Sequence, residues 1–103
     1  MEFDTEHVWI TTRKLKPGVS REEFGRAWRP KEFPEGMLRA YECYSPDSTE
    51  VIGISIWATA QARDAYRLSD VERERRAAMA DFIAEEHSGF YTGRELTIPT
   101  TSA

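Results

Sequence analysis

The chain has 103 residues and carries 18 acidic against 14 basic side chains, which gives a net charge of −4 at pH 7. This length predicts one domain, residues 1–103, near the size at which a second subunit often covers remaining apolar surface. The sequence contains no basic block, so its charge argues against nucleic acid and anionic membranes as partners. One cysteine, Cys43, excludes an internal disulfide, and the acidic start lacks a signal segment, so we expect a cytoplasmic protein.

The first half of the chain predicts a strand, a helix and a hairpin. Residues 7–14 are rich in β-branched and aromatic side chains and end at a proline-glycine turn. Ser20 to Glu23 has the pattern of a capping box, which starts a helix that Pro30 ends. Two further apolar runs, over 37–44 and 51–57, flank a short polar turn and are typical of paired antiparallel strands.

The stretch after Trp57 changes at once to an alanine-rich helical pattern, which breaks near residues 67–69. A second capping box, Ser69 to Glu72, predicts a longer helix that continues to Ser88. We expect Gly89 to be its left-handed C-cap.

The C-terminal part of the chain predicts the end of this helix and one more strand. His87 is expected to act as a cation at the helix C-terminus. Residues 90–98 alternate as a last strand, and residues 99–103 are small, polar and expected to be flexible.

The predicted order is strand, helix, strand, strand, helix, strand, with a core over residues 7–98. This is the βαββαβ order of an α+β, ferredoxin-like sandwich with an antiparallel four-stranded sheet. In the strand over 51–57 both alternating sets of side chains are largely apolar, whereas a strand with one face in water should alternate with polar residues. We therefore expect a homodimer in which two sheets pack face to face.

Three stretches follow one another across the middle of the chain: Ile54-Ser55-Ile56-Trp57, then Ala62 and Tyr66, and then Leu68-Ser69-Asp70. Together they resemble the antibiotic biosynthesis monooxygenase family of dimeric α/β barrels. The resemblance covers roughly residues 7 to 98 and implies the barrel fold. The family includes cofactor-independent monooxygenases that turn phenols into quinones, haem-degrading monooxygenases, quinol oxygenases and members without catalysis.

The site residues of the haem-degrading branch are largely replaced here. Its asparagine, tryptophan and histidine match Thr11, Trp57 and Arg76, so only the tryptophan is kept. Because arginine stays protonated and cannot ligate iron, the sequence disfavours haem degradation. We expect no metal and no cofactor.

The resemblance to the quinone-forming branch implies a site without a cofactor. Its asparagine is replaced by Gly53, and its helix arginine is matched by Arg76 if one residue is skipped. Such an enzyme holds a phenolate in a dry aromatic cavity beside a cation. The predicted catalytic residues are Trp57 and Arg76. The predicted substrate-binding residues are Trp9, Thr11, Trp28 and Tyr66.

Simpler interpretations stay open for the same residues. Trp57 and Trp28 also fit core packing, and Arg76 belongs to a charged run that is typical of a solvated helix face. Cys43 fits a small buried residue, and His7 an exposed strand start. The chain is therefore either a cofactor-independent monooxygenase for a small planar aromatic compound or a non-catalytic ligand-binding or dimerisation module.

Overall fold

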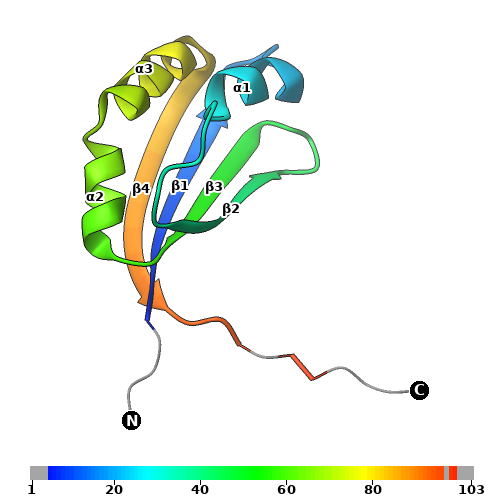
Figure 1. Ribbon diagram of the computed structural model, residues 1–103. Helices are drawn as coiled ribbons and strands as arrows, with labels where there is room; N and C mark the ends of the chain where they lie inside the picture. The colour runs from blue at the N-terminus through cyan, green and yellow to red at the C-terminus, as the bar shows by residue number, and fades with distance from the viewer. Residues whose placement is uncertain (1–4, 97, 100–103) are drawn as a thin grey trace.

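A four-stranded antiparallel sheet with helices on one face makes up the fold, as Figure 1 shows. The computed structural model describes residues 5–96, 98 and 99. The elements in chain order are β1 (Glu6–Leu15), α1 (Arg21–Trp28), β2 (Met37–Tyr44), β3 (Glu50–Trp57), α2 (Ala60–Arg67), α3 (Asp70–Met79), a 3-10 turn (Ala80–Phe82) and β4 (Ile83–Gly93). The strand order is β2-β3-β1-β4, so the predicted ferredoxin-like fold is confirmed. No helix in this described part of the chain is long and apolar enough to cross a membrane.

Side-chain caps fix where the helices begin. The Ser20 hydroxyl accepts a hydrogen bond from the Glu23 backbone at 3.1 Å, and the Ser69 hydroxyl accepts one from the Glu72 backbone at 3.2 Å, as the two capping patterns predict. Thr59 caps α2 in the same way. The Glu72 carboxylate, however, bonds to Arg75 and not back to its own cap, so the second capping box is only half formed.

The predicted boundary between the last helix and the last strand is wrong. α3 ends at Met79, and β4 runs over Ile83–Gly93 where helix was expected up to Ser88. The reason lies in the register with β1, which sets Glu86 opposite Arg13 and Glu85 opposite Lys14. These cross-strand ion pairs, at 2.8 and 3.4 Å, favour a strand for residues with little intrinsic β preference.

Two roles assigned to the end of that helix are therefore wrong as well. Gly89 is a strand residue opposite Ile10, and the described glycines with a left-handed backbone are Gly18 and Gly36. His87 is an exposed strand residue opposite Thr12, so it caps no helix. The predicted flexible tail lies outside the described residues except for Pro99.

The two faces of the sheet differ in what covers them. On β1, Trp9, Thr11 and Arg13 are buried beneath the helices. The side chains between them point to the opposite face, where Ile10 pairs with Ile54 on β3. This second face is apolar along its central strands and carries no helix in the described structure (Figure 1).

Cys43 lies on the face without helices, because it pairs with Ile52 of β3. It is exposed in this chain, so the prediction of a buried cysteine is wrong for the single subunit. The prediction failed because a strand position is buried only when something covers its face, and alternation alone does not say which face is covered.

The core beneath the helices is divided into two clusters. The buried members of one, which we call the aliphatic cluster, are Leu15, Phe24, Val51 and Met79. The buried members of the other, which we call the aromatic cluster, are Trp9, Trp57 and Tyr66. The second cluster adjoins the polar groups described next.

Candidate functional site

A cavity of about 40 Å³ lies between the helices and the middle of the sheet. Side chains from both central strands, from the end of α1, from the 29–36 loop and from α2 and α3 surround it. The lining residues are Trp9, Thr11, Arg13, Trp28, Pro30, Phe33, Met37, Ala40, Gly53, Ile54, Ser55, Tyr66 and Arg75. The wall is therefore aromatic with a few polar groups, which is the usual make-up of a small-molecule site.

The residues predicted to bind substrate all line this one cavity. They are Trp9, Thr11, Trp28 and Tyr66. The sheet presents the first two from β1, because residues two apart in a strand share a face. Trp28 is the last residue of α1, and Tyr66 lies on α2. Whether they bind a substrate stays a prediction, but the structure brings them together.

Trp57 lies behind the cavity and not in its wall. It is fully buried, and its ring packs on Tyr66 with the centroids 5.6 Å apart. Its indole N–H donates a hydrogen bond to the Ser55 hydroxyl at 2.8 Å. Because its one polar atom is already satisfied, Trp57 supports the position of Tyr66 and has no free group for a ligand.

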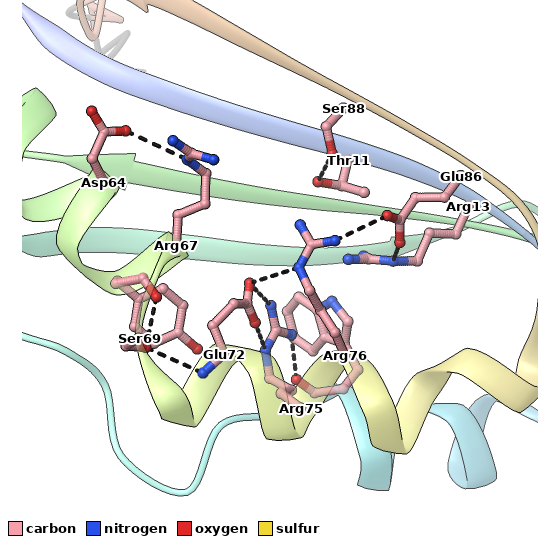
Figure 2. Close-up of polar contacts among 12 residues, drawn as sticks. Thr11, Arg13, Asp64, Arg67, Ser69, Glu72, Arg75, Arg76, Glu86 and Ser88 are labelled. Carbon is pink, nitrogen blue, oxygen red and sulfur yellow. Dashed lines mark hydrogen bonds and ion pairs between the residues drawn. The ribbon is translucent and has the colours of Figure 1, made fainter.

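Arg76 points from α3 toward the edge strand and away from the cavity lining. Its side chain is 41% exposed and forms an ion pair with Glu86 of β4 at 3.3 Å. Figure 2 shows it between Glu72 and Glu86. The neighbouring Arg75 is the α3 arginine that lines the cavity.

A buried carboxylate fixes Arg75. Glu72 has no exposed surface and accepts two hydrogen bonds from the Arg75 guanidinium, at 2.6 and 3.0 Å (Figure 2). Arg75 also donates to the Trp28 backbone carbonyl at 2.6 Å. This paired geometry holds the guanidinium in one orientation, as bidentate arginine–carboxylate pairs do.

A second buried arginine reaches the cavity from the sheet. Arg13 is only 2% exposed and donates to Glu86 at 2.8 Å. Burial lowers the pKa of Arg13, and the adjacent Glu86 acts in the opposite direction. Among the described residues, Arg13, Arg75 and Arg76 form ion pairs with Glu72 and Glu86, so this network of five side chains carries one more positive than negative charge.

The indole N–H of Trp9 has no hydrogen-bond partner among the described residues, although its atom is buried. Trp9 is 5% exposed and packs against Phe90 with the ring centroids 6.0 Å apart. A buried unpaired donor costs about 1–3 kcal/mol, so native proteins rarely leave one without a reason. Thr11, by contrast, shares a hydrogen bond of 2.8 Å with Ser88.

Burial also affects Tyr66, which is 7% exposed. It raises the pKa of the Tyr66 phenol, while the charge of Arg75 and a hydrogen bond from it act against that rise. The neutral phenol is therefore the favoured form in the cavity wall.

Trp28 fills the space next to Gly53, the residue that the sequence resemblance matched to an asparagine of the quinone-forming branch. A Cβ atom at Gly53 would lie 3.1 Å from Cζ2 and 3.3 Å from Nε1 of Trp28. The absence of a side chain on β3 is thus what allows the indole to lie against the strand.

Sequence reasoning missed Arg13, Glu72 and Arg75. Arg13 follows Trp9 and Thr11 at intervals of two, so the strand pattern alone places it on the same face. Glu72 and Arg75 are three residues apart, which sets them side by side on a helix. Their burial left no sequence signal, because both belong to a run of charged residues typical of a solvated face.

Metal-ligating residues do not gather in the described structure. No group of three or more His, Cys, Asp and Glu side chains is placed there to hold a metal ion. The polar residues of the cavity wall carry hydroxyl groups, an indole N–H or a guanidinium.

Comparison with known proteins gave a likeness in structure. Neither the protein-family models nor the curated proteins gave a match to the sequence. Among solved structures, SnoaB, a cofactor-independent oxygenase from Streptomyces nogalater, matches with a TM-score of 0.76 at 17% identity, over 92% of this chain and 98% of that one. A protein from Nitrosomonas europaea, named as a candidate antibiotic biosynthesis monooxygenase, matches with a TM-score of 0.73 at 22% identity, over 84% and 97% of the two chains.

A third match, the protein Rv0793 from Mycobacterium tuberculosis, has a TM-score of 0.66 at 15% identity, over 92% of this chain and 99% of that one. Identities this low show a shared fold. The resemblance to antibiotic biosynthesis monooxygenases is thus confirmed at the level of the fold. The activity has to be argued from the cavity.

Proposed function

We propose that this protein is a cofactor-independent monooxygenase that acts on a small planar aromatic phenol or hydroquinone. The observation that carries the proposal is the cavity itself, which combines aromatic walls with the buried Arg13 and the largely buried Arg75. The structural likeness to a cofactor-independent oxygenase supports it.

The arrangement favours the ionised form of a bound phenol. A phenol in water has a pKa near 10, so little phenolate is present at neutral pH. Beside Arg75 and Arg13 the phenolate is stabilised by charge, and the excess positive charge of the network matches one anion.

The reaction balances without an added reductant. The phenol supplies four electrons and becomes a quinone, and molecular oxygen accepts them. One oxygen atom enters the ring and the other leaves as water. The protein's part is to hold the phenolate, to keep water out and to orient the ring between Trp9, Trp28 and Tyr66.

In this proposal the geometry changes the roles of the two predicted catalytic residues. Arg75 and Arg13 take the part of the cation, and Arg76 orients Glu86, which in turn holds Arg13. Trp57 becomes a positioning residue, because it packs on Tyr66 and is bonded to Ser55.

Oxygen consumption with a panel of phenols and hydroquinones tests the proposal. Replacing Arg75 with methionine keeps the length of the side chain and removes the charge, so we expect kcat/KM to fall about 100-fold. Arg73→Met is the matched control on the same helix, since Arg73 is 71% exposed and pairs only with Asp70 among the described residues. Rates are referred to folded protein by near-ultraviolet circular dichroism, because Glu72 loses its partner in Arg75→Met.

Turnover by the wild type on none of these compounds would contradict the proposal. Equal losses in Arg75→Met and Arg73→Met would contradict the assigned role of Arg75. Trp57→Phe and Arg76→Ala are expected to retain more activity than Arg75→Met, because neither residue lines the cavity.

One observation favours the second candidate function, a non-catalytic ligand-binding or dimerisation module. The cavity of about 40 Å³ is well below the several hundred cubic ångströms of ordinary ligand sites. A protein of this kind binds a small aromatic molecule or none, consumes no oxygen and keeps the same fold.

The remaining parts of the proposal concern the whole molecule. We place residues 7–98 in one domain and expect a homodimer through the face without helices, where Ile10, Ile54 and Tyr41 lie side by side across three strands. A cytoplasmic location belongs to the same proposal. Light scattering at micromolar concentration tests the dimer, and a monomer mass there would contradict it.

A further inference from the structure

Trp28 belongs to a wall that two neighbouring spaces share. The inner one is the cavity of about 40 Å³, and the outer one is a groove of about 520 Å³ along β2 and the 29–36 loop. Trp28, Pro30, Phe33, Met37 and Ala40 line both. Because the two spaces share a wall, a change in that wall changes the volume that a ligand can reach.

The Trp28 indole packs against β3 at Gly53. The missing side chain at Gly53 leaves room for ring atoms that would come within 3.1–3.5 Å of a Cβ there. Non-bonded carbon atoms prefer about 3.5–4.0 Å, so alanine at this position presses on the indole.

Arg75 holds Trp28 from the helix side. Its guanidinium carbon lies 5.5 Å from the centre of a Trp28 ring, and it donates to the Trp28 carbonyl. Arg75 is in turn fixed by the buried Glu72. The indole thus lies between the Arg75 guanidinium and the backbone of β3 at Gly53, and contacts on both sides fix its position.

We propose that Trp28, seated on Gly53, sets the size of the planar ligand that the inner cavity admits. The inference rests on the proposed function for the choice of aromatic ligands. With the indole in place the site takes a single ring. Without it the inner cavity joins the groove, and the site takes a fused two-ring compound of the naphthol class.

Isothermal titration calorimetry with phenol and 2-naphthol under nitrogen tests this without any turnover. We expect Trp28→Ala to bind 2-naphthol at least tenfold more tightly than the wild type does, with Trp28→Phe in between. Leu68→Ala is the control for losing an apolar side chain, because Leu68 is 72% exposed and lines neither space. Trp28→Phe keeps an aromatic ring, so it gives the answer if the alanine variant fails to fold.

Equal naphthol affinity in the wild type and the Trp28 variants would overturn the inference, and so would a lack of binding by all of them. Failure of the proposed function looks different. If the protein consumes no oxygen but Trp28→Ala gains naphthol binding, the role of Trp28 in ligand size is supported and the oxygenase function is contradicted. If the protein consumes oxygen but Trp28→Ala does not gain naphthol binding, the oxygenase function is supported and the role of Trp28 in ligand size is contradicted.

Urea denaturation separately tests the contact between Gly53 and the Trp28 indole. Gly53→Ala is expected to lower the unfolding midpoint of the wild type, whereas in Trp28→Ala it leaves the midpoint unchanged or raises it, since alanine is the better strand residue. Gly93→Ala is the control, because a Cβ there meets nothing within 4 Å. If Gly53→Ala lowers the unfolding midpoint equally in the wild type and in Trp28→Ala, the contact with the Trp28 indole is not the cause of the loss.

Discussion

The aliphatic cluster and the aromatic cluster lie beneath the same helices and differ in chemistry. Leu15, Phe24, Val51 and Met79 pack with partly buried apolar side chains, and the buried Arg13 lies opposite Val51 at the border of this cluster. Trp9, Trp57 and Tyr66 adjoin buried charges and an unpaired indole N–H. One end of the helix-covered face is thus a closed core, and the other end has polar groups at a cavity.

We interpret this difference as a division between residues that stabilise the protein and residues of the proposed ligand site. Burying an ion pair costs desolvation that apolar residues of the same size avoid, so Glu72 and Arg75 are poor choices for stability alone. An unpaired buried donor adds to that cost. We therefore propose that stability comes mainly from the aliphatic cluster and that the aromatic cluster is organised around the proposed ligand site.

The largest effect on this comparison is expected from Phe24→Ala. Phe24 has no exposed surface in the aliphatic cluster, and truncation leaves a cavity, so the free energy of unfolding should fall by about 3–5 kcal/mol. Phe33→Ala is the control, because Phe33 is 71% exposed. Urea denaturation measures both, and similar losses for the two variants would contradict the division of roles.

The next largest effect is expected from Glu72→Ala, which leaves Arg75 buried without its carboxylate. We expect a loss of about 3 kcal/mol in the free energy of unfolding. Glu74→Ala, at an exposed site on the same helix, should change it by less than about 0.5 kcal/mol.

The Glu72–Arg75 ion pair is also expected to be less stabilising than apolar side chains of similar size would be at the same positions. The double variant Glu72→Leu with Arg75→Met should recover most of the lost stability, because neither charge then needs a partner. A double variant that is less stable than Glu72→Ala would show that the pair is a net stabiliser, against the comparison drawn above.

A smaller effect distinguishes the two buried tryptophans. Trp57→Phe loses the hydrogen bond to Ser55, whereas Trp9→Phe removes a donor that has no partner in the described structure. Thermal unfolding should therefore show Trp57→Phe to be the less stable variant by about 1 kcal/mol. The reverse order would mean that the Trp9 N–H is satisfied in solution.

The smallest effect is expected at alkaline pH and involves Tyr66 of the aromatic cluster and Tyr44, which packs against the aliphatic cluster. Burial raises the pKa of both Tyr66 and Tyr44 in the folded protein. Their stabilising contribution is then fully present below the unfolded value near 10, and it is lost as the pH rises through the folded pKa. Tyr66→Phe and Tyr44→Phe should each reduce the fall in stability above pH 10, and a fall unchanged in both would contradict this.

The fold could be predicted almost entirely from local signals. Ser20 and Ser69 mark helix starts through hydrogen bonds to their own helices, and the strand over 51–57 is recognised by its apolar residues. The start of β4 could not be predicted, because Glu85 and Glu86 become strand residues only through their partners on β1. A pairing between distant segments leaves no trace in a local pattern.

The candidate site could be predicted in part for a similar reason. Trp9 and Thr11 follow from strand alternation, and Tyr66 from a family pattern. The choice between Arg75 and Arg76 depends on a helix rotation of one residue. The buried Glu72 accepts hydrogen bonds of 2.6 and 3.0 Å from Arg75, whereas it lies 3.9 Å from Arg76, which reaches Glu86 instead. Sequence patterns do not record such a rotation when both neighbours are charged.

The central claim is that the cavity beside the aromatic cluster, and not the cluster's buried interior, receives the ligand. Titrating phenol into uniformly ¹⁵N-labelled protein tests it directly, because Trp9, Trp28 and Trp57 each give one indole N–H signal. The account predicts that the Trp9 and Trp28 signals move together and saturate while the Trp57 signal, bonded to Ser55, stays in place. A shift of Trp57 without Trp9, or no saturable shift at all, would contradict it.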